Sequence, residues 1–419
     1  MPDTLTDWLS HLESLHPKTI ALGLDRVAQV RQRLNLSPDF PVIVVGGTNG
    51  KGSVCAMLEA ILQAAGYRVG CYTSPHLLRY NERVRIAGQQ ADDAELCDSF
   101  AAIERARGDI ELTYFEFGTL AAMQCFVSHR VEVAVLEVGL GGRLDAVNVF
   151  DADCAVVTSV DIDHVDYLGD NREAIGYEKA GIFRPGRVAV CGERDAPASL
   201  VRHARDIGAE LWRIGVDFGF TAEPQQWRYQ GPVRARDALP HPALRGGYQL
   251  GNASCVLAVL DALHERLPVD MQAVRQGLLA ARVPGRFQCV PDKPELILDV
   301  AHNPHAARAL AGNLAAMPPA RVWAVCAMLG DKDMAGVVDA LAGQVSVWLV
   351  AGLPGPRGND GGELAVLLRE RGAEVHRFEN VTEALAHASN AADGNDRIAV
   401  FGSFFTVAEA LQARGLSVG

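Results

Sequence analysis

Short apolar runs alternate with segments of helical periodicity along the first third of the chain. The apolar runs that predict buried strands are residues 41–45, 67–72, 131–138 and 154–160. Between them, apolar side chains recur at helical spacing over residues 54–65 and 115–126. Strands that alternate with helices favour a mostly parallel sheet covered by helices on both faces.

The pattern changes further along the chain. Residues 220–244 contain glutamines, aromatic residues and prolines with little periodicity, which indicates an antiparallel excursion or a surface insertion. A helical pattern follows at residues 251–267. Later apolar runs predict strands at residues 296–300, 322–327, 345–350 and 397–400, with helices such as 305–316 and 364–371 between them. Because Pro284 and Gly285 interrupt the pattern, we predict two α/β domains, residues 1–284 and 285–419.

Composition narrows the class of protein. The chain has 419 residues, of which 49% are hydrophobic and 21% charged, and this suits two or three packed domains. A net charge of −12 argues against sequence-independent nucleic-acid binding, which depends on Lys and Arg. No run of about 18 apolar residues predicts a membrane span, and the first residues lack the pattern of a signal peptide. Nine cysteines without a C-x-x-C pair fit a reducing cytoplasm.

The strongest chemical signal is the glycine-rich sequence GGTNGKGS at residues 46–53, between an apolar run and a helical segment. Glycines let backbone N–H groups turn toward an anion, and the start of the helix adds partial positive charge. Lys51 can reach the β- and γ-phosphate oxygens of a nucleotide. The match to a general P-loop is imperfect, since Gly52 follows the lysine and Ser53 comes one residue later. The alternative is a plain glycine-rich turn.

A nucleotide site of this kind needs a metal ion with oxygen ligands. Glu137 follows the apolar residues 133–136, and His164 follows the run at residues 154–160. The carboxyl ends of parallel strands face the crevice where α/β folds bind ligands. Both side chains are therefore candidate metal ligands, His164 as a neutral imidazole. The alternatives are a solvated acid at a strand end and a hydrogen-bonded loop histidine.

Seven motifs, in this order, resemble the folylpolyglutamate synthase family, which belongs to the wider group of Mur-type ATP-dependent ligases. They are GTNGKGS at 47–53, TSPHL at 73–77, LEVGLGGRLDAVN at 136–148, DIDHVDYLG at 161–169, EKAGIF at 178–183, PGRF at 284–287 and DVAHNP at 299–304. The likeness runs from near residue 18 to the C-terminus. It implies an N-terminal P-loop ATPase domain with a mostly parallel sheet, a smaller C-terminal Rossmann-like α/β domain, and an active site in the interdomain cleft.

The resemblance also implies roles for matching residues. The residues implied to hold the ATP phosphates are Gly50, Lys51, Gly52 and Ser53. Those implied to bind ATP from the far side of the cleft are Asn252, Arg286, Asp299 and His302. The implied ligands of magnesium, as two ions, are Ser74, Glu137 and His164. The segments implied to line the pterin site are Thr113, Tyr114, Phe115 and Glu116, together with Leu144, Asp145 and Ala146.

Three of these positions are candidate catalytic residues: Lys51, Lys179 and His302. Lys179 resembles a carbamylated lysine that places a carboxylate near the second metal ion. The alternative for Lys179 is a helix lysine paired with Glu178 or another acid. The sequence assigns no general base. Phe117, next to the implied pterin segment, is interpreted as a core aromatic residue.

In this family ATP phosphorylates a carboxylate, and an amine then attacks the acyl phosphate. The implied substrates are dihydropteroate, reduced folates and L-glutamate, and the likeness at 113–116 and 144–146 favours the bifunctional members over a monofunctional folylpolyglutamate synthase. Arg79, Arg83 and Arg85 are candidates for binding these anions, or else form a solvated basic loop. We expect a cytoplasmic monomer without nucleic-acid or membrane partners.

Two other classes of protein would share part of this pattern. A Mur-type ligase that acts on a cell-wall precursor would use the same chemistry, but its P-loop lysine is usually followed directly by Ser or Thr. A nucleotide-binding switch that ligates nothing would not need the DVAHNP motif at 299–304. An alanine at His302 should leave nucleotide binding by such a switch largely unchanged, whereas it should damage turnover by a ligase.

Overall fold

The computed structural model describes residues 2–15, 21–355 and 357–417. The chain divides into two compact units: Met1–Ala243 with Leu250–Arg282, and Leu244–Gln249 with Val283–Gly419. The last crossing between the units falls after Arg282, close to the domain boundary predicted at residue 284. The short segment Leu244–Gln249, which the sequence places in the first domain, groups with the second unit.

An eight-stranded sheet runs through the first unit. Its strands are β1 (Val42–Gly46), β2 (Val69–Tyr72), β3 (Val84–Ile86), β4 (Gln89–Gln90), β5 (Val133–Glu137), β6 (Cys154–Val157), β7 (Val188–Cys191) and β8 (Glu210–Arg213). Their order is β4-β3-β2-β5-β1-β6-β7-β8. The pairs from β2 to β8 are parallel, and β3 and β4 add an antiparallel edge. Every residue of β1, β2, β5 and β6 is buried, and the predicted mostly parallel sheet is confirmed.

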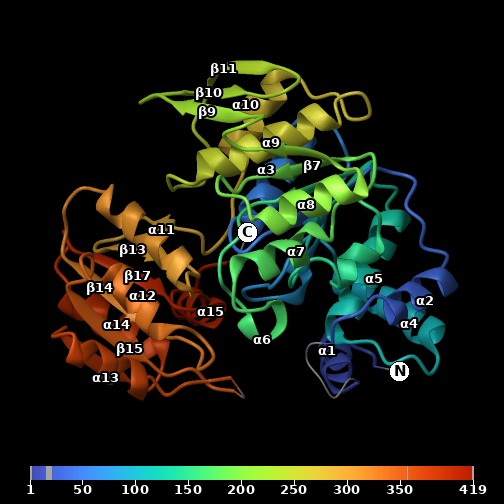
Figure 1. The fold of residues 1–419 in the computed structure, drawn as a ribbon. Helices are drawn as coiled ribbons and strands as arrows, with labels where there is room; N and C mark the ends of the chain where they lie inside the picture. Colours follow the sequence, from blue (N-terminus) through green and yellow to red (C-terminus); the bar gives the residue numbers. More distant parts are fainter. Residues whose placement is uncertain (1, 16–20, 356, 418–419) are drawn as a thin grey trace. The chain divides into compact units, whose positions relative to one another are not determined.

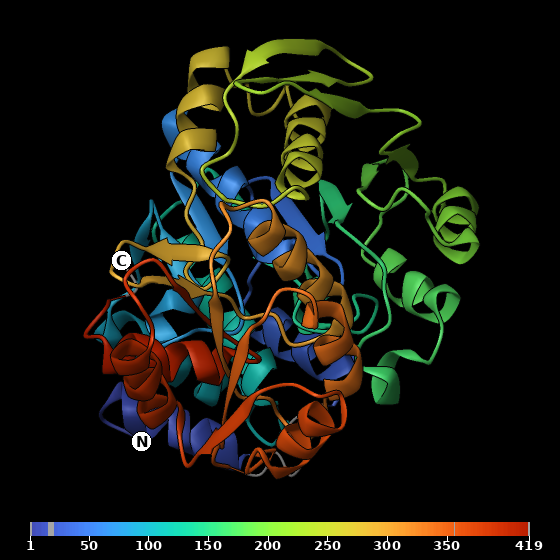
Figure 2. The same ribbon diagram turned by 90° about the vertical axis from the view of Figure 1, so that its left-hand side faces the viewer.

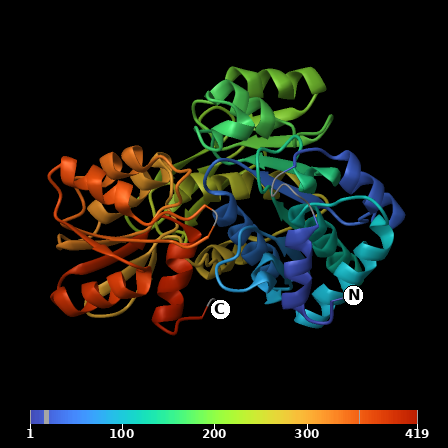
Figure 3. The same cartoon turned by 90° about the horizontal axis from the view of Figure 1, so that it is seen from below.

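Helices cover this sheet (Figure 1). They are α1 (Leu5–Ser14), α2 (Asp25–Arg33), α3 (Lys51–Ala64), α4 (Asp93–Arg107), α5 (Tyr114–Ser128), α6 (Val165–Leu168), α7 (Arg172–Ala180), α8 (Ala198–Ile207), α9 (Gln249–Ala262) and α10 (Met271–Ala280), with the 3₁₀ turns η1 (Tyr80–Arg83) and η2 (Ala146–Val149). Figure 3 shows the green helices α7 and α8 as a group separate from the cyan helices α4 and α5. α3 begins at Lys51 rather than at residue 54, because the left-handed Gly50 already caps it.

Residues 219–239 form a separate antiparallel sheet, which lies next to α9 in Figures 1 and 2. Its strands are β9 (Gly219–Ala222), β10 (Trp227–Gln230) and β11 (Ala235–Leu239), in the order β11-β10-β9. The antiparallel excursion predicted near residues 220–244 is therefore confirmed. Tyr229 is fully buried, and its hydroxyl donates to Asp261 of α9 at 3.2 Å. The Asp261 Oδ1 atom also lies 2.7 Å from Arg236, an ion pair without hydrogen-bond geometry.

The second unit holds a six-stranded sheet. Its strands are β12 (Gln288–Val290), β13 (Glu295–Leu298), β14 (Val322–Cys326), β15 (Val347–Ala351), β16 (Val375–Phe378) and β17 (Arg397–Phe401). Their order is β12-β13-β17-β14-β15-β16, and only the β12–β13 pair is antiparallel. The helices are α11 (Pro304–Ala315), α12 (Met334–Leu341), α13 (Gly362–Glu370), α14 (Val381–Ala391) and α15 (Phe404–Ala413).

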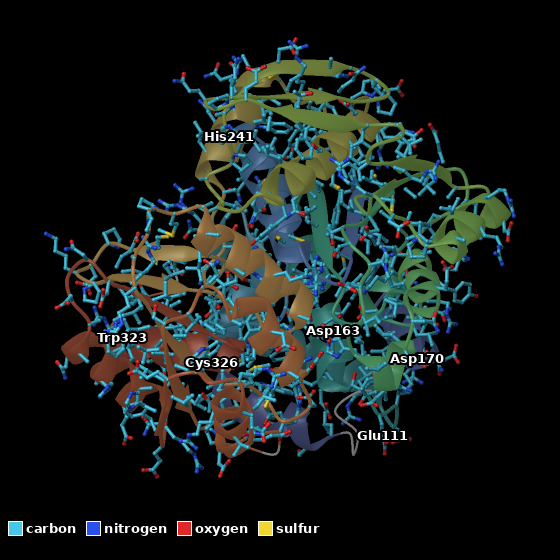
Figure 4. All side chains as sticks on the ribbon, turned by 60° about the vertical axis from the view of Figure 1, so that its left-hand side comes forward. Glu111, Asp163, Asp170, His241, Trp323 and Cys326 are labelled. Atoms are coloured by element: carbon cyan, nitrogen blue, oxygen red, sulfur yellow. The ribbon has the colours of Figure 1, made fainter. Side chains whose placement is uncertain are left out.

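The predicted α/β alternation of this unit is confirmed, with two strands added. The sequence did not predict β12 and β16, because both are short edge strands whose residues are partly exposed. Every residue of the central strands β14 and β17 is buried by contrast, and Figure 4 labels Trp323 and Cys326 of β14. In the described part of the chain, no helix has the length and apolar character needed to cross a membrane.

Candidate active site

The glycine-rich turn joins β1 to α3, and two of its glycines have backbone conformations that other residues rarely adopt. Gly47 has a φ of 143°, and Gly50, the N-cap of α3, has a φ of 89°. A Cβ atom on Gly47 would overlap the Thr158 Oγ1 atom, so no side chain fits there. The turn thus leads directly into the N-terminus of a 14-residue helix. This arrangement is suited to binding phosphate groups.

The end of the neighbouring strand β6 braces this turn. The backbone N–H of Thr48 donates to the Ser159 carbonyl at 2.9 Å, and the N–H of Asn49 donates to the Ser159 hydroxyl at 3.0 Å. The Thr158 hydroxyl donates to the Asn49 carbonyl at 2.6 Å, and the Thr48 hydroxyl donates to the Asp161 carbonyl at 3.0 Å. Sequence reasoning missed Thr158 and Ser159, although polar residues that directly follow a buried strand are a usable signal.

Lys51 and Asn252 both lie at this turn. The Lys51 Nζ atom donates to the carbonyls of Gly47 at 2.9 Å and Thr48 at 3.3 Å, so its ammonium group lies over the loop. Asn252 of α9 packs against Gly50, where a Cβ atom would come 2.8 Å from the Asn252 Oδ1 atom. Asn252 therefore belongs to the P-loop side of the protein, in the first unit, and not with the ATP residues expected on the far side of the cleft.

Two predicted metal ligands are held together at the carboxyl edge of the sheet. Glu137, the last residue of β5, is 4% exposed, and its Oε2 atom accepts a hydrogen bond from the backbone N–H of Ser74 at 3.1 Å. A Cβ atom on Gly52 would meet only the Glu137 Oε1 atom, at 3.9 Å. The first turn of α3 thus lies close to this carboxylate. A carboxylate and a serine hydroxyl are the hard oxygen donors that magnesium requires, so these residues fit the ion.

His164 has a left-handed backbone with a φ of 53° and caps the short helix α6. Its backbone N–H donates to the Asp163 Oδ1 atom at 2.9 Å, and its Nε2 atom lies 3.9 Å from the same oxygen. Figure 4 labels Asp163 on this loop. Among the described residues, no three His, Cys, Asp or Glu side chains cluster as a metal site would. The predicted ligand set contains only two residues of these types, so its assignment stays a prediction.

Lys179 of α7 is 3% exposed in the interior of the first unit. Burial, followed by the charge of Lys51, lowers the pKa of Lys179 to about 7. Glu178 instead pairs with Arg143, at 2.8 Å. Glu178 is therefore not the partner of Lys179. The charges of Asp163 and Asp145 partly oppose the lowering of its pKa. A lysine that is partly neutral near pH 7 has a nucleophilic amine, as carbamylation requires.

Asp145 caps η2 with a side chain that is 3% exposed. Its carboxyl accepts hydrogen bonds from the backbone N–H groups of Leu140 at 2.8 Å and Val147 at 3.0 Å. Burial raises the pKa of Asp145 to about 7, against the effect of these amides. Both Asp145 carboxyl oxygens therefore hold the backbone of the loop that follows β5. The sequence predicts a pterin site at this loop.

The aromatic residues of the predicted pterin segment do meet this loop. The Phe115 ring lies against Gly139, where a Cβ atom would come 2.7 Å from the ring, and it packs at a tilt against Tyr72 with centroids 5.9 Å apart. Leu144 is half-buried and Ala146 is buried on the same loop. The structure therefore brings the two predicted segments together.

Thr113 and Glu116 have a different structural role from Phe115. Each side chain accepts a hydrogen bond from the other residue's backbone N–H, which forms a capping box at the start of α5. The second oxygen of Glu116 pairs with Arg26 at 3.0 Å, and Arg26 also donates to the Ala21 carbonyl at 2.8 Å. Glu116 is 2% exposed, so it supports the segment rather than facing a substrate. Phe117 is fully buried, and its interpretation as a core residue is confirmed.

The three arginines predicted near the substrate have three different environments. Arg79 is largely exposed and pairs with Asp93 at 3.2 Å. The Arg83 guanidinium lies over the rings of Tyr80 and Tyr114, 5.4 Å from each centroid. Arg85 forms an ion pair at 2.8 Å, described further below, with an acid of α3. A single solvated basic loop is therefore not what the structure shows.

In the second unit, Arg286 and His302 flank the ring of Phe404. The Arg286 guanidinium lies 5.5 Å from the Phe404 centroid, and the His302 ring lies 6.3 Å from it. Asp299, just after β13, accepts from the backbone N–H groups of Phe287 and Ala301, both at 2.8 Å. Burial raises the pKa of Asp299 to about 6, although the charge of Arg286 opposes this. Sequence reasoning missed Phe404, which no motif marks.

Comparisons with known proteins agree with this geometry. The Mur ligase middle domain matches residues 45–259, and the Mur ligase glutamate ligase domain matches residues 285–404. The chain is 47% identical over 410 residues to dihydrofolate synthase/folylpolyglutamate synthase of Escherichia coli, covering 97% of this chain and 95% of that one. The relative of that name in Mycobacterium tuberculosis is 34% identical, over 91% of this chain and 85% of its own length.

Solved structures are similar over the whole length. E. coli FolC in complex with DHPP and ADP superposes with a TM-score of 0.94 at 46% identity, covering 99% of both chains. A bifunctional folylpolyglutamate synthase/dihydrofolate synthase with Mn, AMPPNP and L-glutamate bound gives a TM-score of 0.92 at 50% identity, covering 99% of this chain and 98% of that one. The chain therefore belongs to the dihydrofolate synthase/folylpolyglutamate synthase family of Mur-type ATP-dependent ligases.

Proposed function

We propose that this protein uses ATP to join L-glutamate to dihydropteroate, forming dihydrofolate, and to reduced folates, forming folylpolyglutamates. The names and bound molecules of its relatives support these substrates. The observation that carries the proposal is the P-loop turn beside the Ser74–Glu137 pair. A monofunctional folylpolyglutamate synthase and another Mur-type amino-acid ligase are the alternatives.

The first step makes the substrate carboxylate electrophilic by transferring the γ-phosphoryl group of ATP to it. In the proposal Gly50, Gly52 and Ser53 hold the phosphates at the start of α3, and Lys51 moves from the loop carbonyls to the transferring group. Magnesium, as two ions bound by Ser74, Glu137 and His164, would neutralise charge on the phosphate oxygens. The amine of glutamate then attacks the acyl phosphate, forms the amide bond and releases phosphate.

Lys179 is proposed to react with carbon dioxide, so that its neutral amine forms a carbamate and releases a proton. Its burial and its lowered pKa support this. The modification would replace a buried cation by an anion near the metal ions. Intact mass spectrometry with and without bicarbonate, on wild type and Lys179→Met, would detect it.

The pteroate substrate is proposed to lie against Tyr114, Phe115, Leu144, Asp145 and Ala146, with Thr113 and Glu116 holding the segment in shape. Arg83 is the arginine suited to a substrate carboxylate. Two aromatic rings and a 2.8 Å hydrogen bond from its Nε atom to the His76 Nδ1 atom fix its orientation. The two terminal nitrogens of a guanidinium can bind a carboxylate through paired hydrogen bonds.

The remaining assignments complete the proposal. Arg286, Asp299 and His302 of the second unit, and Asn252 of the first, are proposed to bind ATP, with His302 acting in turnover. Functional domains at residues 1–284 and 285–419 would correspond to the two family models. Nine free cysteines, seven of them buried, suit the cytoplasm. Gel filtration would test the proposed monomer.

The deciding experiment measures ADP release by the purified protein with ATP, magnesium and L-glutamate, with dihydropteroate and with tetrahydrofolate in parallel. We expect turnover with both acceptors, each product gaining one glutamate by mass spectrometry. Turnover with tetrahydrofolate alone would reduce the protein to a folylpolyglutamate synthase. No turnover with either would exclude the proposal and favour another Mur-type ligase, for which amino-acid and cell-wall acceptors would be screened.

A further inference from the structure

Arg85 uses all of its side-chain donors inside the protein. On β3 it sits opposite Cys71 of β2. Its Nε and Nη2 atoms donate to the Glu59 carboxylate at 2.8–3.1 Å, and Nη2 also donates to the Cys71 Sγ atom at 3.2 Å. Its Nη1 atom donates to the Thr73 hydroxyl at 3.1 Å and to the Glu82 carbonyl at 2.8 Å. A guanidinium bound in this way has no donor left for a substrate.

The partners of Arg85 belong to three separate parts of the site. Glu59, 7% exposed, lies on α3, the helix that begins at Lys51 in the P-loop. Thr73 is the first residue after β2, and Ser74 follows it directly. Glu82 belongs to η1, in the loop that closes back onto β3. A single rigid fork therefore ties the P-loop helix to both ends of the loop that carries Ser74.

We infer that Arg85, held by Glu59, is a positioning residue that fixes Thr73 and thereby presents Ser74 to the metal beside Glu137. The inference rests on the proposed function, because it takes Ser74 and Glu137 as metal ligands. Few contacts separate Arg85 from the predicted metal ligands. Arg85 donates to the Thr73 hydroxyl, and the backbone N–H of the adjacent Ser74 donates to Glu137 at 3.1 Å. Groups that orient metal ligands typically change metal affinity about 10–100-fold when removed.

A purely structural role must be separated from positioning. Breaking a buried ion pair by removing one partner leaves an uncompensated charge and destabilises the fold, whereas removing both partners together restores stability. The double variant Arg85→Met/Glu59→Leu removes both charges at similar volume, yet it cannot restore the bond to Thr73. Arg85→Lys keeps the charge but loses the fork that reaches Thr73 and Glu59 at once. Arg79→Met, on the same loop but exposed, is the control.

The experiment measures Mn²⁺ affinity by electron paramagnetic resonance with AMPPNP present, together with thermal unfolding. We expect Arg85→Lys and the folded double variant to bind Mn²⁺ about tenfold more weakly than wild type, and Arg79→Met to match wild type. Unchanged Mn²⁺ affinity in Arg85→Lys, or recovery of affinity in the double variant, would overturn the inference. Mn²⁺ binding needs no folate, so loss of the proposed ligase activity in wild type would show up separately, in the turnover assay.

Discussion

Two loops that leave the carboxyl edge of the first sheet are built in opposite ways. The P-loop turn after β1 owes its shape mainly to the backbone conformations of Gly47 and Gly50, and the hydroxyls of Thr158 and Ser159 after β6 brace it. The loop at residues 73–85 after β2 is shaped by charged side chains. Glu82 accepts from three backbone N–H groups at 2.6–2.7 Å, and Arg85 ties both ends of the loop to α3.

The difference shows which functions can be predicted from a local sequence. A loop whose shape depends on backbone conformation needs glycine at fixed positions, so its sequence indicates its role. A loop built by side chains uses ordinary arginines and glutamates, whose roles depend on partners far away in the chain. Glu59 lies 26 residues from Arg85, and no local pattern connects the two. The comparison predicts that the two loops respond differently to substitution.

The largest effect is expected for Gly47→Ala in the backbone-built loop. Its Cβ atom would overlap Thr158 and would also impose strain at a φ of 143°. We expect kcat/KM for ATP to fall by about 100-fold or more, because a displaced loop misplaces the phosphate-binding amides. Steady-state kinetics would measure this. Gly66→Ala is the control, since Gly66 has a φ of 93° but open space around it; an equal loss there would attribute the effect to backbone strain alone.

A second effect concerns the loop after β5, where a titratable side chain holds the backbone. The pKa of Asp145 is raised to about 7 from an ordinary value of 3.8, so the folded state binds this proton more tightly than the unfolded state. Its contribution to stability is present below about pH 4 and is lost as the pH rises through about 7, by up to about 4 kcal/mol. Urea unfolding between pH 4 and 8 would measure it.

Asp145→Asn serves as the reference for that pH series. The amide does not titrate, although it leaves one of the two backbone N–H groups without a good acceptor. We therefore expect the variant to be less stable at pH 4 and its deficit to shrink as the pH rises. A constant difference between the two curves would contradict a raised pKa. The pKa of Asp299, about 6, affects both proteins equally.

Sequence reasoning reached the fold and the backbone-built part of the site. The alternation of apolar runs and helical segments predicted both sheets, because strands buried on both faces must be apolar. The motifs grouped Ser74 with Glu137, and the structure places the two residues in contact. Sequence reasoning did not anticipate the buried partners of two charged residues: the Glu116 carboxylate caps a helix, and Arg85 is saturated by internal partners such as Glu59. The presence of a charged residue in a sequence does not reveal whether it interacts with solvent, substrate or another side chain.

A smaller effect is expected for Glu82→Gln in the loop built by side chains. The glutamine keeps one acceptor oxygen but turns an NH₂ group toward the N–H groups of Leu77, Leu78 and Arg79. We expect a loss of about 1.5–3 kcal/mol, the range for hydrogen bonds to a charged group. Hydrogen exchange should speed up at these three amides before it does so in α3. Glu111→Gln, at the exposed Glu111 labelled in Figure 4, is the control.

The smallest effect is expected for Arg79→Ala, which tests the third arginine of the loop. Arg79 and Asp93 have side chains 65% and 58% exposed, and a pair of this kind contributes less than about 1 kcal/mol to stability. Since Arg79 is neither stacked like Arg83 nor saturated like Arg85, KM for a polyglutamated substrate should change by less than about twofold. Kinetics at low and high salt would measure this. A tenfold rise in KM that salt abolishes would show that Arg79 attracts the anionic chain, and the loop would then bind substrate through two arginines instead of one.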